Sequence, residues 1–329
     1  PLGLPLLREQ LAQHYSDEGL PTRPDQVLIT NGAQQGISLA IGSLLRSGDA
    51  CVLETPTFFG AIDALRAARA RLVGVDVDAD GPSPAAFERA VAQHGPRLAF
   101  LTPTFQNPTG SVMPALARER IGAVIARSQV PLIEDDTLID LSFGRTTPPR
   151  IAALAPDAPI ISIGSLSKLY WAGLRVGWMR VPDALLPRLV QAKTLADFGS
   201  ALPSQVIAGR LLADLPRLRE LRRATALPGR DLLVSLLRER VPTWEFEVPA
   251  GGQFLWVRLP TRNATGFTQV AGRHGVRVFP GAAMGVTALP DCWLRLPFTM
   301  PIELLADAVA RLADAWADFV RRDGHDRLG

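Results

Sequence analysis

The chain has 329 residues, a net charge of +3 at pH 7, 47% hydrophobic residues and 20% charged residues, as in an ordinary globular protein. This length is sufficient for one large hydrophobic core and a smaller second one. The charge is too small to indicate nucleic-acid binding, the two cysteines exclude a disulfide framework and a multi-cysteine metal site, and no apolar run is long enough to cross a bilayer.

Short apolar segments alternate with helical patterns through the first two thirds of the chain. Several of these segments are continuously apolar, which is typical of strands covered on both faces. The alternation predicts a mostly parallel, seven-stranded sheet with helices on both faces, and functional groups at the carboxyl ends of the strands. The predicted strands are 27–30, 50–54, 71–77, 97–103, 131–136, 160–164 and 176–181, and helices are predicted over 34–46, 60–69, 84–93 and 115–127.

The pattern changes at about residue 204. A long helical stretch rich in Leu and Arg reaches about residue 240, and short strands and a closing helix follow it. We therefore predict an α/β fold with a large domain over residues 1–210 and a smaller α/β domain over residues 211–329, and we leave open that residues 1–15 pack on the small domain. The later strands are predicted over 244–248, 254–259, 276–280 and 293–298, and the closing helix over 301–322.

Two turns that follow predicted strands carry residues suited to binding a ligand. Gly32 leads into a helix that opens at Ala33 and Gln34, and the free N–H groups of a helix start attract phosphate. Asn107 begins the segment "NPTG", in which Pro108 stiffens the turn and holds the asparagine at a strand end. Taken alone, each segment is also what an ordinary turn looks like.

Charged and hydroxyl side chains follow two later strands. Three carboxylates over 134–136 end a buried apolar strand, where they are costly unless they meet a cation or a hydrogen-bond donor. The segment "GSLSKLYWAGLRVG" then holds Ser165, Ser167, Lys168 and Arg175. Hydroxyls and a guanidinium together can bind a dianion, so this segment is a second candidate for phosphate binding.

Lys168 is one of only two lysines in the chain, and the other is Lys193. An aliphatic amine can form a Schiff base with an aldehyde, which a guanidinium cannot do. At a site that needed only a positive charge, arginine would serve nearly as well, and this chain uses arginine almost everywhere. The retained lysine therefore favours amine chemistry at position 168.

Together these motifs resemble the fold-type I pyridoxal-phosphate enzymes, specifically the class I/II aminotransferases, in which "NPTG", an aspartate strand end and "SLSK…GLRVG" occur in this order. The resemblance implies pyridoxal 5'-phosphate as cofactor. It implies that Lys168 is the catalytic residue that forms the Schiff base and moves a proton at the substrate Cα, and that Arg295 and Asn107 bind the substrate. The implied cofactor-binding residues are Ala33, Gln34, Phe58, Asn107, Asp135, Ser165, Ser167, Lys168 and Arg175.

Two of these positions have a second reading, and the sequence departs from the family pattern at one place. Phe58 fits either a ring stacked on the cofactor or an ordinary core residue, and Arg295 fits either a substrate ligand or the solvated face of a strand. Thr137 and Leu138 stand where the family usually has a tyrosine that donates to the 3'-oxygen of the cofactor, which puts efficient turnover in doubt.

Two segments of the chain are most similar to the aminotransferase-like domains of MocR-type regulators of the GntR family. They are "PLGLPLLREQLAQHYSDEGLPTRPDQVLITNGAQQGISLA" and "GSLSKLYWAGLRVGW". This resemblance implies an effector-sensing domain of a transcription regulator with an amino acid or related amine as ligand. We expect a cytoplasmic homodimer that contacts no membrane, and that contacts DNA only through an N-terminal domain outside these residues. The alternatives are a free-standing aminotransferase acting on an α-amino acid and a 2-oxo acid, and a scaffold that has lost the cofactor.

Overall fold

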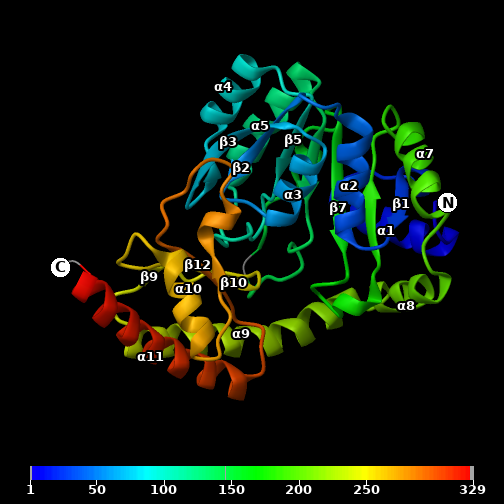
Figure 1. Cartoon of the computed structure of the whole chain (residues 1–329). Coiled ribbons are helices and arrows are strands. Elements are labelled where there is room, and N and C mark those ends of the chain that lie inside the picture. Colours follow the sequence, from blue (N-terminus) through cyan, green and yellow to red (C-terminus); the bar gives the residue numbers. More distant parts are fainter. Residues whose placement is uncertain (1, 145, 327–329) are drawn as a thin grey trace.

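A computed structural model describes residues 2–144 and 146–326, and its larger part is a sheet between layers of helices (Figure 1). Its strands lie in the order β1-β8-β7-β6-β5-β2-β3-β4. Their bounds are β1 (Val27–Thr30), β2 (Ala50–Thr55), β3 (Arg71–Asp78), β4 (Gly81–Pro82), β5 (Leu98–Leu101), β6 (Leu132–Asp135), β7 (Ile160–Ser165) and β8 (Gly177–Arg180). The central strands pair in parallel, whereas β8 is antiparallel to both β7 and β1. The prediction of a mostly parallel sheet is confirmed.

All seven predicted strands form, but the sheet has eight strands, so the predicted count is corrected. The additional strand, β4, contains two residues and pairs with the end of β3 through Val77 and Asp78. Its Gly81 adopts a φ of 88°, in the left-handed region that favours glycine. Two residues carry no alternating pattern, so the sequence offers no means of distinguishing this strand from a turn.

Alternate side chains of the sheet enter two separate hydrophobic cores. In β5, Leu98 and Phe100 pack into one core, while Ala99 and Leu101 pack into the other. Burial on both faces explains why these strands are continuously apolar in sequence. The first core includes α2 (Ala33–Leu44), α3 (Phe59–Ala67) and α7 (Leu186–Asp197), and the second includes α1 (Pro5–Asp17), α4 (Pro84–His94), α5 (Ala115–Ser128), α6 (Ile151–Leu154) and α8 (Leu202–Leu212).

Helix α1 packs on the large sheet, which corrects the alternative that residues 1–15 pack on the small domain. Leu7, Leu11 and Tyr15 belong to the same core as β1, and Trp178 Nε1 in β8 donates to the Tyr15 hydroxyl at 3.0 Å. The buried face of α1 is thus covered by large-domain partners. Its sequence pattern defines that face but does not identify what covers it.

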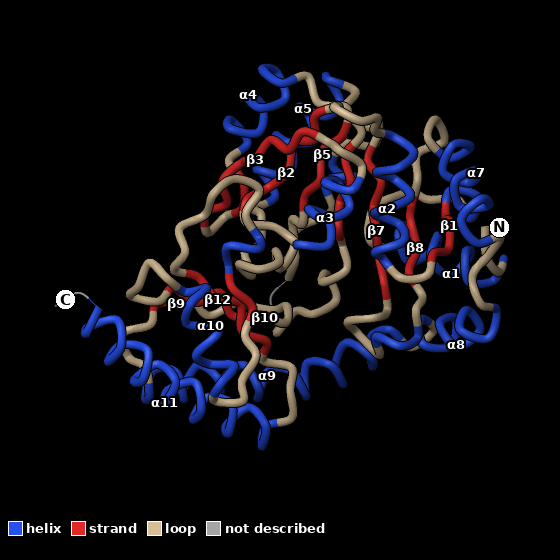
Figure 2. Tube along the Cα trace, viewed as in Figure 1, coloured by secondary structure: helices blue, strands red, loops and turns tan. Residues whose placement is uncertain are grey.

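The smaller domain is an antiparallel sheet packed with three helices (Figure 2). Its strands, in the order β11-β12-β10-β9, are β9 (Glu245–Phe246), β10 (Phe254–Arg258), β11 (Phe279–Pro280) and β12 (Trp293–Pro297), and its helices are α9 (Leu215–Arg240), α10 (Ala264–Arg273) and α11 (Ile302–Asp326). Trp244, Phe267 and Trp316 form edge-to-face contacts in its core. No helix within the described residues is both long and apolar enough to cross a membrane.

Helix α9 joins the two domains. Leu215 and Leu218 near its start belong to a large-domain core, whereas Leu233 and Leu237 near its end belong to the small-domain core. The chain therefore passes from one core to the other along a single helix, and the boundary at residue 210 stays a prediction.

Candidate active site

A cavity of about 340 Å³ lies between the carboxyl ends of the large-sheet strands and the small sheet. Every residue predicted to bind cofactor or substrate lines it: Ala33, Gln34, Phe58, Asn107, Asp135, Ser165, Ser167, Lys168, Arg175 and Arg295. The lining also includes Phe59, Thr102 and Phe254, which the sequence analysis did not select. These residues come from widely separated segments, so the fold brings together what the sequence places far apart.

The turn between β1 and α2 meets Arg175 at one end of the cavity. Arg175 Nη2 donates to the carbonyl of Asn31 at 2.7 Å, and a Cβ on Gly32 would lie 2.7 Å from the same nitrogen. Gly32 has a φ of 79°, a backbone conformation that favours glycine. Nearby, the Ser165 and Ser167 hydroxyls lie 3.0 Å apart. A helix start, two hydroxyls and a guanidinium together suit a phosphate dianion.

Lys168 lies in the loop after β7, with its side chain exposed at the cavity. Partial burial and the nearby Arg295 guanidinium lower the pKa of its ammonium group, while the Asp135 carboxylate opposes this effect. A lower pKa increases the fraction of neutral amine near neutral pH. Because the neutral amine is the nucleophile, the surroundings favour reaction with a carbonyl carbon.

Of the three carboxylates over 134–136, only Asp135 lines the cavity. It is 4% exposed and accepts a hydrogen bond from the Thr137 N–H at 3.0 Å. Burial raises the pKa of this carboxyl. Among the described residues no lysine or arginine forms a salt bridge with it. A buried carboxyl without a cation of its own suits a ligand that brings a protonated nitrogen.

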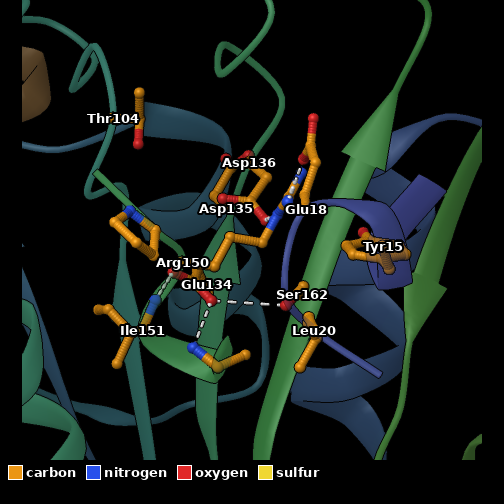
Figure 3. A network of polar contacts seen from close by, with 12 residues as sticks. Tyr15, Glu18, Leu20, Thr104, Glu134, Asp135, Asp136, Arg150, Ile151 and Ser162 are labelled. Carbon is orange, nitrogen blue, oxygen red and sulfur yellow. Dashed lines mark hydrogen bonds and ion pairs between the residues drawn. The ribbon is translucent and has the colours of Figure 1, made fainter. Parts of the chain in front are cut away.

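The other two carboxylates belong to a polar network on the opposite side of β6 (Figure 3). Arg150 donates through Nε to Asp136 Oδ2 at 2.8 Å and pairs through Nη1 with Glu18 at the end of α1. Glu134 accepts two backbone N–H groups at the start of α6. Successive side chains along a strand point to opposite faces, which separates this pair from Asp135. Both carboxylates hold the fold beside the cavity.

Arg295 lies at the other end of the cavity, where its Nη1 donates to Asn107 Oδ1 at 3.0 Å. Its guanidinium carbon is 4.2 Å from the ring centre of Phe254, 4.7 Å from that of Phe279 and 5.6 Å from that of Phe59. Burial lowers the pKa of Arg295 to about 10, so it stays charged at neutral pH. It has no carboxylate partner in the described part of the chain, which suits a ligand that supplies one.

Phe58 and Gln34 line the cavity beside the start of α3. The ring of Phe58 packs against Phe59 with centroids 5.1 Å apart, and Gln34 Nε2 donates to the carbonyl of Gly60 at 2.9 Å. Phe58 is partly buried, and its ring contacts the core as well as the cavity. Stacking of this ring on a cofactor stays a prediction.

Residues 1–312 match the family model described as aminotransferase class I and II. The chain belongs to this family. It is 33% identical over 305 residues to the 2-aminoadipate transaminase of Thermus thermophilus, a match that covers 91% of this chain and 77% of that protein. Its structure is similar to that of LysN, an α-aminoadipate aminotransferase of Thermus thermophilus complexed with N-(5'-phosphopyridoxyl)-L-leucine. The TM-score is 0.91 and the identity 30%, over 97% of this chain and 83% of the other.

Regulators are also relatives of this aminotransferase-family chain. It is 32% identical over 263 residues to the HTH-type transcriptional regulator YisV of Bacillus subtilis, covering 78% of this chain and 54% of the regulator. It is 28% identical over 256 residues to the probable rhizopine catabolism regulatory protein MocR of Rhizobium meliloti, covering 74% of this chain and 49% of MocR. The chain thus spans about half the length of these regulators. The predicted fold-type I architecture and the resemblance to both groups are confirmed.

The wall of the cavity beside Asp135 is formed by Thr137 and Leu138. The chain has two tyrosines, and neither lines the cavity: Tyr15 is buried against Trp178, and Tyr170 is 50% exposed. Leu138 therefore contributes an apolar surface where the family resemblance led us to expect a phenol.

A buried glutamate that the sequence analysis did not select supports the turn that carries Asn107. Glu54, in β2, has no solvent-exposed surface and accepts hydrogen bonds from Thr102 N–H at 3.1 Å and Gln106 Nε2 at 2.9 Å. Burial raises the pKa of Glu54 to about 7. The only signal in the sequence was one acidic residue in the otherwise apolar segment 50–54.

The raised pKa of Glu54 predicts a defined pH dependence of stability. The folded chain holds this proton up to about pH 7, whereas the carboxyl has an ordinary pKa of 4.5 when unfolded. As pH rises from 4.5 to 7, the unfolded state ionises first, so the contribution of this group to the free energy of unfolding falls, by at most on the order of 3 kcal/mol. Glu54→Gln should remove this decline, because its amide oxygen can accept the same donors. Urea midpoints measured across this pH range check it.

Glu239→Gln is the matched control, because Glu239 is exposed near the end of α9. We expect its urea midpoints to follow those of the wild type at every pH. Wild-type and Glu54→Gln profiles that run parallel from pH 4.5 to 7 would contradict the assignment.

Proposed function

We propose that this chain is a pyridoxal 5'-phosphate-binding, aminotransferase-type domain that reacts through Lys168 with an α-amino acid or a related amine. The observation that carries the proposal is the meeting of an amine, a buried carboxyl without a cation and an anion-binding turn in one cavity. The amine would react with the aldehyde of the cofactor, the carboxyl would bind its ring nitrogen, and the turn would bind its phosphate. The ligand held by LysN likewise joins a phosphopyridoxyl group to an amino acid.

The cavity residues would hold the cofactor at both ends. The N–H groups of Ala33 and Gln34, the hydroxyls of Ser165 and Ser167 and the guanidinium of Arg175 would bind the phosphate. The glycine of this turn has a φ of 79°, which leaves its backbone free to adopt the conformation that leads into the start of α2.

Asp135 would bind the ring nitrogen and keep it protonated. Its carboxyl is buried and takes its hydrogen bonds from Thr137, an uncharged residue, so a charged partner would relieve its desolvation. When bound, the cofactor supplies an electron sink for the charge that develops at the substrate Cα.

Lys168 and Arg295 would act on the substrate from two sides. Arg295 and Asn107 bind the α-carboxylate and thereby fix the substrate Cα in the cavity. Lys168 Nζ would accept the proton that leaves this carbon, and its lowered pKa increases the fraction of neutral amine that can do so. The aromatic rings around Arg295 keep water from its faces and strengthen the charge interaction.

We assign this domain first to effector sensing in a MocR/GntR-type regulator. Similarity to HTH-type regulators over more than two thirds of this chain supports the assignment, as does the apolar Leu138 where a phenol would assist turnover. DNA contact would then belong to a region outside these residues. Both cysteines are free, which fits a reducing compartment, so we place the protein in the cytoplasm.

The alternative is a free-standing aminotransferase that moves an amino group from an α-amino acid to a 2-oxo acid. The 33% identity to a 2-aminoadipate transaminase and the presence of Lys168, Asp135 and Arg295 together in the cavity favour it. Sustained turnover of an amino acid with 2-oxoglutarate by the purified chain would decide for the enzyme. A helix-turn-helix encoded upstream in the same gene, with no such turnover, would decide for the regulator.

Lys168→Ala tests the proposed function directly. The wild type mixed with pyridoxal 5'-phosphate should gain visible absorbance, and borohydride should fix the cofactor to the peptide that contains Lys168. The variant should show neither, because it has no amine in the cavity. The chain carries its own control, since Lys193 is its only other lysine. Label on Lys193, or visible absorbance that survives in the variant, would refute the role of Lys168.

Arg295→Ala tests the substrate end of the cavity. We expect the Kd for an amino acid in the cofactor-loaded protein to rise about 100-fold, because a bidentate charge-assisted contact is lost. The Kd for the cofactor should change less than about threefold, since the residue lies away from the phosphate turn. Arg258→Ala is the matched control, on the neighbouring strand and paired with Glu245. Equal amino-acid affinity in the wild type and Arg295→Ala would overturn this role.

We also propose that the chain forms a homodimer through an apolar patch on α7, α8 and their connection. The patch contains Leu195, Phe198, Leu202, Val206 and Ile207, which are between 46% and 80% exposed. Contiguous exposed apolar side chains of this kind mark protein contacts. A second copy of the chain is the occupant that the resemblance to this family implies.

Phe198→Asp should therefore convert a dimer into a monomer in sedimentation velocity. Phe198 is 80% exposed and has a φ of 58°, which aspartate tolerates better than phenylalanine, so the monomer should keep its fold. Val320→Asp, at an exposed apolar position on α11, serves as the control. An unchanged sedimentation coefficient in Phe198→Asp would contradict the assigned interface.

A further inference from the structure

The second lysine of the chain is buried and has no part in the chemistry described above. Lys193, in α7, has no solvent-exposed surface. Its Nζ donates to both carboxylate oxygens of Asp197 and to Ser200 Oγ at 3.1 Å. A compact ammonium can thus satisfy three acceptors in a closed site, which the planar fork of arginine does not match. This geometry accounts for a second lysine in an arginine-rich chain.

Asp197 connects this lysine to the turn before α2. Besides Lys193, it accepts hydrogen bonds from Asn31 Nδ2 at 2.7 Å, Gln35 Nε2 at 2.8 Å and Gly199 N–H at 3.0 Å. Burial opposes ionisation of this carboxyl, but the hydrogen bonds from Lys193 and Gln35 outweigh it and hold the pKa of Asp197 below its usual range. The carboxylate therefore stays ionised and holds one side chain of the turn, Asn31, and one in the first turn of α2, Gln35.

The turn before α2 is fixed by hydrogen bonds of Asn31 and by the packing of β8. Asn31 donates its N–H to Gln35 Oε1 at 2.8 Å and accepts Arg175 at its carbonyl, so its side chain, N–H and carbonyl are all engaged. A Cβ on Gly177 would lie 2.6 Å from the carbonyl carbon of Gly32, so β8 also packs closely against the turn. Helix α2 has no side-chain cap at its start. The position of its first N–H groups therefore depends on these contacts.

We propose that Lys193 and Asp197 are positioning residues for the anion end of the cavity. Through Asn31 and Gln35 they hold the first N–H groups of α2, and through the Asn31 carbonyl they orient Arg175, in the arrangement that receives a phosphate. This inference rests on the proposed function, because it concerns the phosphate of the same cofactor.

An ion pair that only stabilised α7 would need no contacts to the turn beside the cavity. A buried salt bridge is by itself weak evidence for stability, because desolvation offsets most of the attraction. Here the carboxylate uses two of its contacts on the turn beside the cavity and on the first turn of α2 rather than on the rest of α7. Loss of the pair should therefore affect phosphate binding more than it affects binding of the remainder of the cofactor.

The experiment compares pyridoxal 5'-phosphate with pyridoxal, which has the same aldehyde and ring but no phosphate. Kd values are measured by visible absorbance for the full chain and for Asp197→Asn and Asn31→Ala. Asn31→Ala leaves the Lys193–Asp197 pair intact, so it remains informative if Asp197→Asn fails to fold. Asp307→Asn, in an exposed ion pair with Arg311 on α11, is the control.

We expect the Kd for pyridoxal 5'-phosphate to rise about tenfold in both variants, which corresponds to about 1.4 kcal/mol, while the Kd for pyridoxal changes less than about twofold. Asp307→Asn should match the wild type with both compounds. An unchanged ratio of the two Kd values in Asn31→Ala would overturn the inference. A wild type that binds neither compound would instead overturn the proposed function, and the inference with it.

Discussion

Three basic side chains and a single carboxylate line the cavity, and the rest of the site depends on how the basic groups are held apart. Lys168, Arg175 and Arg295 line the cavity, and Asp135 is the one acidic residue in its described lining. Like charges at close range repel by several kcal/mol in a partly buried site. Rigid contacts fix the two arginines at opposite ends, Arg175 on the Asn31 carbonyl and Arg295 on Asn107. The positive electrostatic potential at both ends of the cavity favours a ligand with a phosphate at one end and a carboxylate at the other.

The chemistry at the strand ends could be predicted because it is local in sequence. Parallel strands end at one edge of the sheet, so residues that directly follow buried strands meet there whatever the details of packing. Asn107 and Lys168 illustrate this, since each lies within a few residues of a strand that the apolar pattern located correctly. Alternation along β6 also selects Asp135 over its two acidic neighbours, but only once the strand bounds are known.

The surroundings of those residues could not be predicted, because they depend on register and long-range packing. Phe279 meets Arg295 because β11 pairs with β12 at that position, and Phe254 lies diagonally across from it on β10. Both rings are ordinary strand residues in the sequence. Glu54 and Lys193 were also missed, since burial rather than residue type gives them their roles. The signal for Glu54 was an acidic residue inside an apolar segment, and the signal for Lys193 was a second lysine in a chain rich in arginine.

The network on the far side of β6 links the cavity to both domains. Glu18 of α1 pairs with Arg150, which binds Asp136 beside Asp135, and also with Arg219 of α9 at 2.9 Å. Burial opposes ionisation of Glu18, but Arg150 outweighs it and lowers the pKa of Glu18 to about 2. Separating α9 from α1 would break the Glu18–Arg219 pair, whereas Arg150 would keep its contacts with Glu18 and Asp136. The start of α9 is therefore tied to α1 through Arg219 and to the large-domain core through Leu215 and Leu218, while Leu233 and Leu237 further along the same helix lie in the small-domain core.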